Sequence, residues 1–363
     1  MKPFVYTGLL ITLCACQPAA ESESESRSMG NLLGATTAQY AEVLPEKQFS
    51  FPADHQAHND FRQEWWYLTA NLIDEQGQPL GLQWTQFRFG LTPNTEELPQ
   101  DWQASQLYMA HSAITTKEQH WAEEKWSRGI PELAGVSANP FAVFIDNWRW
   151  QGSTNNLFPA SLSVQEDDFS YQLQLSASAP LQLQGQQGYS VKNAAADVAS
   201  YYYSQPYIQI TGEVTLAGIT KKVSGMGWLD REWSSQFLTD SQQGWDWFAL
   251  RFNNQTTLML FQLRADEASG QPHFYAGNLM QPDGSNQPLA SSDIQMTAQA
   301  WQQTSTANYP VSWRLTIPSQ QLDITINALN PNANMPLSIP YWEGPIQFSG
   351  SHQGDGYMEL TGY

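Results

Sequence analysis

Apolar and polar residues alternate along most of this chain, which is the pattern of half-buried β-strands. Between residues 169 and 175, Phe, Tyr and Leu occupy every second position, and Ser or Gln occupies the positions between them. Residues 66–72 and 208–216 follow the same alternation. Turn-forming residues at 253–254 and 282–284 separate such runs. Short alternating runs at this spacing predict an antiparallel, all-β barrel or sandwich rather than a helical or α/β protein.

The same pattern predicts many further strands and one short helix. Further strands are expected at residues 80–91, 247–252, 258–263, 274–279, 294–300, 311–317, 322–328 and 357–362. Only residues 116–127 favour a helix, because Trp121 and Lys125 would share a helical face. We expect no more than a turn or two there.

The length of 363 residues suggests two domains, each large enough for its own core. A polar loop at residues 239–243 follows a distinctive charged and aromatic stretch, so we place the boundary near Phe237. This division predicts an N-terminal domain at residues 46–236 and a C-terminal domain at residues 237–363. The charged stretch would then lie at the junction of the two domains.

The N-terminus has the features of a lipoprotein signal. Residues 1–15 combine Lys2 with an apolar run too short to span a bilayer. The sequence Leu-Cys-Ala-Cys that ends at Cys16 resembles a bacterial lipobox, which predicts cleavage before Cys16 and a lipid on its sulfur. Gln17 in place of Asp predicts sorting to the outer membrane, facing the periplasm. Residues 16–45, rich in Glu and Ser, would form a flexible tether; an ordinary secretion signal is the alternative.

The composition narrows the classes of function. The formal net charge of −19 argues against nucleic acid as a partner, because binding phosphates requires a basic surface. The 15 Trp, 15 Tyr and 16 Phe would fill β-protein cores, and a surplus of them would suit an apolar pocket. Both cysteines lie in the N-terminal segment, so disulfides do not stabilise the folded part.

Candidate chemical groups are most concentrated in two neighbouring motifs, residues 225–236 and 244–248, which together contain four Trp, three carboxylates and one Arg. On a strand, Asp230 and Glu232 would point to one face, and Arg231 and Trp233 to the other. Two carboxylates beside indoles repel each other and lose solvent, so one of them could keep its proton near neutral pH and act as a general acid. The alternative is a structural ion-pair network.

Three other parts of the sequence contain candidate residues. The loop at residues 54–60 has Asp, His and Asn at close spacing, but these are also turn formers and the spacing fits no well-defined site, so we predict no metal and no cofactor. His111 lies among apolar neighbours and is either a core residue or part of a pocket wall. Glu64 shares a face with Trp66 and would point inward, where it needs a partner.

The usual signatures of covalent hydrolases are absent from the sequence. There is no Gly-x-Ser-x-Gly elbow, and a chain cleaved before Cys16 and lipidated there has no free thiol.

Several motifs together resemble one family. They are Leu-Asp-Arg-Glu-Trp-Ser-Ser-Gln at 229–236, Gly-Trp-Asp-Trp-Phe at 244–248, Pro-Ala-Asp-His at 52–55 and Glu-Trp-Trp-Tyr at 64–67. With Tyr-Trp-Glu-Gly-Pro at 341–345, they resemble the AttH and carotenoid 1,2-hydratase-like proteins, which are secreted or lipid-anchored bacterial proteins. The match runs from about residue 51 to 363.

This resemblance implies two lipocalin-like β-domains packed together around a pocket for an apolar, isoprenoid-like small molecule. It also implies hydration of a carbon–carbon double bond. The candidate catalytic residues are Asp230, Glu232, His111 and Glu64, and the candidate ligand-binding residues are Tyr67, Arg231, Trp233, Trp245, Asp246 and Trp247.

One position departs from the carotenoid hydratases, which have His where this chain has Arg231. The resemblance therefore leaves a second function open, that of a non-catalytic binding protein. It would be an accessory component of an AttH-type ABC export system and would contact transporter subunits.

Overall fold

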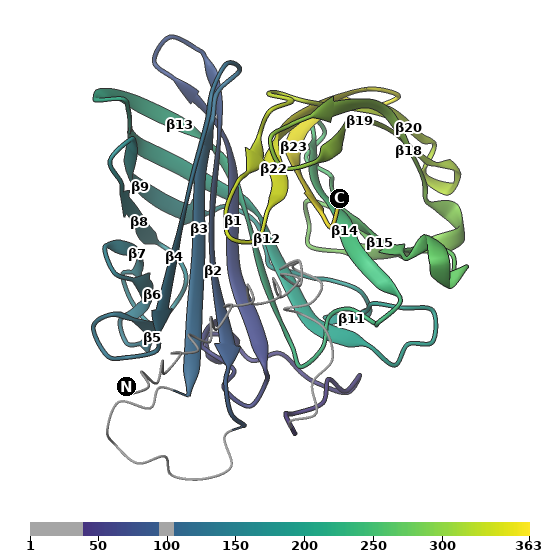
Figure 1. Cartoon of the computed structure of the whole chain (residues 1–363), viewed down its shortest axis with the longest axis horizontal. Helices are drawn as coiled ribbons and strands as arrows, with labels where there is room; N and C mark the ends of the chain where they lie inside the picture. The colour runs from purple at the N-terminus through teal and green to yellow at the C-terminus, as the bar shows by residue number, and fades with distance from the viewer. Residues whose placement is uncertain (1–38, 94–104) are drawn as a thin grey trace, which may run out of the picture.

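The computed structural model describes residues 39–93 and 105–363 (Figure 1). The predicted signal at residues 1–15, the lipidation site Cys16 and most of the predicted tether lie outside the described residues. Within these two described ranges, no helix is long and apolar enough to cross a membrane.

The described chain is built almost entirely of antiparallel strands, joined by turns and four short 3-10 helices. The strands of the first sheet are β1 (Gln63–Asp74), β2 (Pro79–Gly90), β3 (Gln106–Thr115), β4 (His120–Arg128), β5 (Ala134–Ala138), β6 (Phe141–Ile145), β7 (Trp148–Gly152), β8 (Ala160–Gln165), β9 (Phe169–Ala177), β10 (Gln182–Leu183), β11 (Tyr189–Val191), β12 (Ala199–Leu216) and β13 (Ile219–Ser234). Those of the second are β14 (Gln242–Phe252), β15 (Thr257–Ala265), β16 (Phe274–Met280), β17 (Asn286–Leu289), β18 (Gln295–Gln303), β19 (Asn308–Ile317), β20 (Leu322–Ala328), β21 (Asn334–Met335), β22 (Tyr341–Gly350) and β23 (Gly354–Thr361). The 3-10 helices are η1 (Ala53–His55), η2 (Glu267–Ser269), η3 (Ser291–Asp293) and η4 (Pro318–Gln320).

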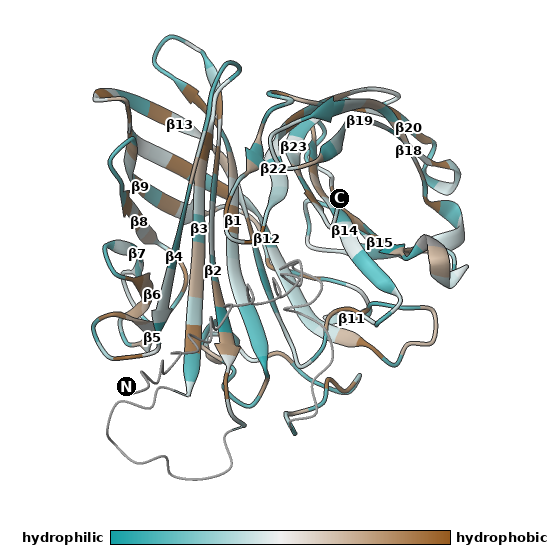
Figure 2. Ribbon diagram, in the orientation of Figure 1, coloured by the Kyte–Doolittle hydropathy of each residue, from teal (hydrophilic) through white to brown (hydrophobic). Residues whose placement is uncertain are grey.

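Both sheets curl around an apolar interior (Figure 1). The first follows the order β4-β3-β2-β1-β13-β12-β9-β8-β7-β6-β5, and the second the order β17-β16-β15-β14-β23-β22-β20-β19-β18. Hydrophobic and hydrophilic residues alternate along the long strands in Figure 2, as the sequence pattern predicts. Large side chains such as Trp84, Trp150 and Tyr171 fill the first interior, and Phe248, Trp313 and Trp342 fill the second. The prediction of an all-β fold with two packed, lipocalin-like sheets is confirmed.

The outer faces of the two sheets pack against each other through their central strands. Strand β1 lies against β23, and β2 against β22. A separate apolar cluster joins Tyr67, Tyr202 and Trp228 of the first sheet to Trp247 and Tyr357 of the second. The interface between the sheets is therefore a third buried layer with its own side chains.

The predicted helix at residues 116–127 is wrong. The backbone of Thr116 closes a turn with Gln119, and the chain then returns along β3 as strand β4. The backbone hydrogen bonds that a helix would make internally are made instead to the neighbouring strand.

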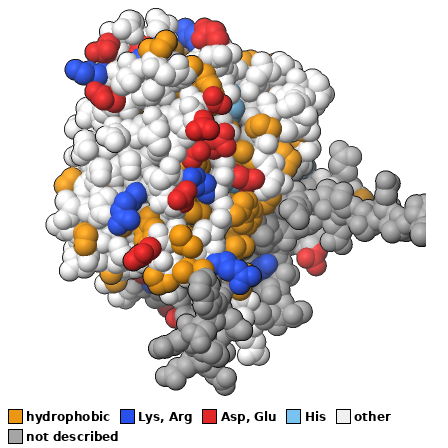
Figure 3. Space-filling view, turned by 60° about the vertical axis from the view of Figure 1, so that its left-hand side comes forward, with side chains coloured by type: hydrophobic (Ala, Val, Ile, Leu, Met, Phe, Trp, Pro, Cys, Tyr) orange, Lys and Arg blue, Asp and Glu red, His pale blue; other side chains and the backbone are white. Residues whose placement is uncertain are grey.

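Acidic side chains are spread over several parts of the face shown in Figure 3, in keeping with the formal net charge of −19. Such a surface repels anions at long range.

Candidate functional site

Two strands at the centre of the first sheet direct the acidic residues toward the second sheet. In the pairing of β1 with β13, Tyr67 lies opposite Asp230 and Trp65 lies opposite Glu232. These four side chains share the outer face, because successive residues of a strand point to opposite sides. Arg231 and Trp233 point the other way, into the first interior.

A cavity of about 70 Å³ lies between the two sheets at this point. Its apolar wall is formed mainly by Trp65, Phe87, Phe237, Trp245, Trp247 and Phe261. Its polar lining consists of Tyr67, Thr85, Lys192, Tyr202, Asp230, Glu232, Tyr341 and Glu359. Both sheets and the segment that joins them therefore contribute to one site.

Asp230 is a buried carboxyl that accepts three hydrogen bonds. Ser204 and the Trp228 indole donate to Oδ1, the latter at 2.6 Å, and the Tyr202 hydroxyl donates to Oδ2 at 2.5 Å. Burial raises the pKa of Asp230 to about 7, although these donors work in the opposite direction. Asp230 therefore changes its charge near neutral pH.

Glu343 and Glu359 form a coupled pair of carboxyls at the cavity. They lie directly opposite each other on β22 and β23. The Tyr67 hydroxyl donates to Oε1 of Glu343 at 2.5 Å and is also a hydrogen-bonding neighbour of Glu359. Burial raises the pKa of Glu359 to about 8, and burial together with the charge of Glu359 raises the pKa of Glu343 well above its usual range. This pair holds at least one proton at neutral pH.

Glu232 has a different environment from these three carboxyls because it has a cationic partner. Lys192 lies 2.6 Å from Oε1 of Glu232, and Ser200 donates to the same oxygen. The ammonium of Lys192 also lies 4.4 Å from the centre of the Phe261 ring. Glu232 therefore balances the charge of Lys192 within the cavity wall.

The indoles of β14 border the carboxyls. Trp245 Nε1 donates to Oε1 of Glu359 at 3.2 Å, and Trp247 Nε1 donates to the Tyr202 hydroxyl at 3.1 Å. The rings of Trp247 and Tyr67 meet edge to face, with centroids 5.2 Å apart. Acids and aromatic ring faces thus share one small space.

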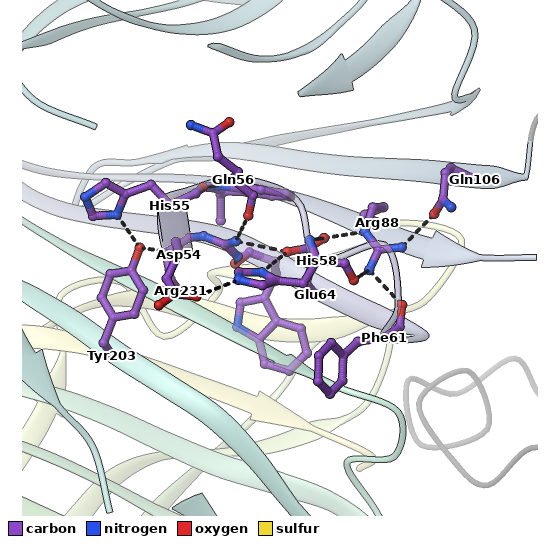
Figure 4. Close-up of polar contacts among 12 residues, drawn as sticks. Asp54, His55, Gln56, His58, Phe61, Glu64, Arg88, Gln106, Tyr203 and Arg231 are labelled. Atoms are coloured by element: carbon purple, nitrogen blue, oxygen red, sulfur yellow. Dashed lines mark hydrogen bonds and ion pairs between the residues drawn. The ribbon is translucent and has the colours of Figure 1, made fainter. Parts of the chain in front are cut away.

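Glu64 and Arg231 belong to a separate network inside one end of the first sheet (Figure 4). The Glu64 carboxylate contacts both Arg88 and Arg231, the latter at 2.9 Å. The two guanidinium groups also bind backbone carbonyls of the loop before β1, including those of Gln56 and His58. Burial alone would raise the pKa of Glu64, but Arg88, His58 and Arg231 hold it well below its usual range.

Trp233 and the loop at residues 54–60 complete this network. The His58 ring stacks on Trp233 at 3.8 Å and contacts Asp54 at 3.3 Å. Lys47 lies 2.9 Å from Asp54. Across the described residues, no group of His, Cys, Asp and Glu side chains is arranged to hold a metal ion. The loop closes the end of the first interior through ion pairs and ring stacking.

Two further predicted residues lie away from the cavity lining. His111 is fully buried on β3, with Nδ1 2.9 Å from the Tyr341 hydroxyl. Asp246 is buried in the second sheet, where Arg264 and the Tyr363 hydroxyl each lie 2.6 Å from Oδ1. The expectation of one pocket bordered also by Glu64, His111 and Trp233 is corrected accordingly: Tyr67, Asp230, Glu232, Trp245 and Trp247 line the cavity.

The sequence interpretation missed Lys192, Tyr202, Glu343 and Glu359. A usable signal existed for the two glutamates, since each interrupts an apolar run near the C-terminus, in Tyr-Trp-Glu-Gly and Met-Glu-Leu. Nothing in the sequence indicated that β22 and β23 would bring these two residues to Tyr67.

The fold and the cavity define a class of protein in which two curled β-sheets enclose an acidic, aromatic site between them. The chain belongs to the AttH-like family, whose model matches residues 42–363. It is similar to the crystal structure of a protein of Nitrosomonas europaea assigned to AttH, with 31% identity, a TM-score of 0.79 and coverage of 89% of this chain and 99% of that one. It also shares its fold with kievitone hydratase from Nectria haematococca, with 13% identity, a TM-score of 0.66 and coverage of 89% and 96%. No curated protein matches the chain.

Proposed function

We propose that this protein adds water to a carbon–carbon double bond of an apolar, isoprenoid-like molecule bound between the two sheets. The observation that carries the proposal is the presence of Asp230 and Glu359 in one aromatic-walled cavity, both with a pKa raised into the neutral range. A raised pKa in a cleft is the property of a catalytic acid. The shared fold with kievitone hydratase supports an architecture suited to hydration.

The environments of the two carboxyls assign the roles, because Glu359 faces a second carboxyl whereas Asp230 accepts three hydrogen bonds that stabilise its ionised form. Glu359, with its pKa near 8, keeps its proton at neutral pH and is the acid that protonates the alkene. Asp230, with its pKa near 7, loses its proton first and is the base that accepts a proton from the attacking water. The carbon–hydrogen bond forms with the proton of Glu359, and the carbon–oxygen bond forms with water. The net change in the substrate is the addition of one water; before the next turnover Asp230 releases the proton it gained to solvent and Glu359 takes up a new one.

The indoles of Trp245 and Trp247 stabilise the cation formed between these two steps. Both line the same cavity as Glu359 and Asp230. The ring face of an indole stabilises a desolvated cation by about 2 kcal/mol.

The identity of residue 231 does not decide between catalysis and binding. Arg231 is fully buried and binds Glu64 inside the first sheet, on the side of β13 opposite Asp230. The difference from the carotenoid hydratases at this position therefore removes no group from the cavity.

We also propose, on the N-terminal sequence alone, that lipid on Cys16 anchors the protein in the outer membrane, facing the periplasm.

The decisive experiment incubates the purified protein with a small neutral isoprenoid alkene such as 2-methyl-2-butene, in isotope-labelled water. We expect a product heavier by one labelled water. Glu359→Gln and Asp230→Asn should each lower its rate of formation at least about a hundredfold, with ligand binding retained in a tryptophan fluorescence titration. Glu213→Gln, on β12 away from the cavity, is the control and should act like the parent protein. Tight binding without product would instead favour the ABC-export binding protein.

A further inference from the structure

A line of neighbouring polar groups that can carry protons runs from the buried Glu343 to the edge of the first sheet, and only some of its contacts are hydrogen bonds. The Tyr341 hydroxyl is a hydrogen-bonding neighbour of Glu343 and lies 2.9 Å from Nδ1 of His111. On its other side, Nε2 of His111 lies 3.6 Å from Oε2 of Glu124. The line thus crosses from β22 through β3 to β4, where His111 and Glu124 lie directly opposite each other.

The two ends of this line differ in their contact with solvent. Glu343 is 1% exposed and His111 is 0% exposed. The Glu124 side chain is 20% exposed and accepts hydrogen bonds from the backbone and hydroxyl of Ser338. Glu359 itself faces the cavity, but Glu343 does not line it. Glu343 therefore needs a path through the protein to exchange its proton while a ligand fills the cavity.

We propose that Tyr341 and His111 form a proton path between Glu124 at the surface and the Glu343–Glu359 pair. The inference rests on the proposed function, in which Glu359 gives up a proton in each turnover. Tyr67 completes the path, because its hydroxyl contacts Glu343 and is a neighbour of Glu359.

Each transfer conserves charge and breaks one bond for each that it forms. After Glu359 has given up its proton, Glu343 reprotonates it through the Tyr67 hydroxyl, which loses one proton and gains another. A proton from solvent, taken up briefly by the Glu124 carboxylate, moves to the unprotonated Nε2 of His111, and the proton on Nδ1 leaves to the Tyr341 oxygen. The original hydroxyl proton of Tyr341 passes to the Glu343 carboxylate. Imidazole suits the central position because it takes a proton at one nitrogen and releases one at the other.

The protonation states of His111 and Glu124 fit proton transfer from the surface toward Glu343. Burial lowers the pKa of His111 despite the opposing effect of Glu124, so the resting ring is neutral and accepts a proton. Burial works against the ionised form of Glu124, but the neighbouring His111 ring and hydrogen bonds from Ser338 lower its pKa to about 2. Glu124 therefore carries the negative charge that stabilises a transient imidazolium.

His111 could instead have a purely structural role, and the substitution His111→Gln distinguishes that role from proton transfer. His111→Gln retains a polar group that can hydrogen-bond to Tyr341 but cannot pass a proton between two nitrogens. His111→Phe removes both abilities. His120→Gln is the matched control, since His120 is a partly buried histidine at the β3–β4 turn, bonded to Thr115 and close to Met335.

The experiment follows the carbonyl stretch of the protonated carboxyls by infrared spectroscopy after rapid mixing into heavy water, with 2-methyl-2-butene filling the cavity. Glu343→Gln assigns the band of Glu343. We expect deuterium exchange of that band to slow at least about tenfold in both His111→Gln and His111→Phe, with no change in His120→Gln. Added imidazole should restore part of the rate in a His111→Ala variant.

The outcomes separate this inference from the function on which it rests. A Glu343 band that exchanges as fast in His111→Gln as in the parent protein would overturn the proton path and leave the acid intact. Absence of any protonated carboxyl band at neutral pH would overturn the proposed function itself. If His111→Phe does not fold, His111→Gln decides alone.

Discussion

At the scale of single residues, the carboxyls of the site differ in protonation because their surroundings differ. Asp230 has three neutral donors, Glu232 has the ammonium of Lys192, and Glu359 has a second carboxyl opposite it. Neutral donors and cations favour the charged form of a carboxyl, whereas burial and a neighbouring carboxyl favour the protonated form. One small cavity can therefore hold an acid, a base and a fixed ion pair.

The raised pKa of Glu359 has a cost in stability that can be measured. In the unfolded chain a glutamate loses its proton above pH 4.5, whereas folded Glu359 keeps it to about pH 8. The free energy of unfolding therefore falls as pH rises through this window, by about 1.4 kcal/mol for each pH unit. We predict that Glu359→Gln becomes increasingly more stable than the parent protein from pH 5 to about pH 8, and that the difference is then constant.

Urea unfolding at a series of pH values measures this difference. The control Glu213→Gln should run parallel to the parent protein at every pH. A Glu359→Gln variant that is less stable than the parent at pH 9 would show that the carboxylate is well solvated or paired in the folded state.

The sequence identified half of the acidic cluster and missed the other half for a physical reason. Asp230 and Glu232 are two positions apart on one strand, so local alternation alone places them on the same face. Glu343 and Glu359 reach Tyr67 only through the packing of one sheet on the other. Glu64, like Glu232, is a glutamate followed by a tryptophan in the sequence. Its side chain nevertheless points into the interior of the first sheet, because it lies on the other face of β1 from Trp65 and Tyr67.

At the scale of elements, β4 shows how pairing with a neighbouring strand overrides the helix propensity of a segment. Residues 120–128 contain Ala, Glu and Lys, which favour helices in isolation. The register with β3 gives this segment a full ladder of backbone hydrogen bonds and places Glu124 opposite His111. A nine-residue helix is marginal without such partners, so the neighbouring strand decides the structure.

The packing of β2 against β22 depends on a glycine. A Cβ added at Gly81 would lie 2.5 Å from Cγ of Pro345, closer than atoms can approach without movement. We predict that Gly81→Ala lowers the free energy of unfolding by about 1–3 kcal/mol, as overpacked sites do. Because the clash lies between the sheets, it should also weaken ligand binding in the cavity.

The control is Gly135→Ala on β5, where the nearest atom to an added Cβ is a Phe144 ring carbon at 3.4 Å. Thermal unfolding should show no loss of stability there. Pro345→Ala, which removes Cγ and Cδ, should recover part of the loss in the Gly81→Ala background. Equal stabilities of the two glycine variants would mean that the sheets separate easily at this contact.

At the scale of the whole molecule, the cavity belongs to neither sheet alone. Asp230 and Tyr202 of the first sheet, Trp247 and Glu359 of the second and Phe237 of the connecting segment all line it. Composition and strand pattern predict two sheets, but they do not specify which faces meet. That arrangement depends on distant contacts such as Tyr67 with Glu343 and Asn71 with Gly356.

The shared layer predicts that the two halves depend on each other for folding. Tyr202 and Trp228 are 2% and 0% exposed on the outer face of the first sheet, and they pack with Trp247 of the second. Residues 39–236 expressed alone would expose these aromatic side chains, which favours aggregation. We predict one cooperative calorimetric transition for the whole chain, and strong binding of a hydrophobic dye by either isolated half. Two separate transitions, with monomeric halves that bind no dye, would show instead that each sheet is an independent domain and that the cavity forms only when they dock.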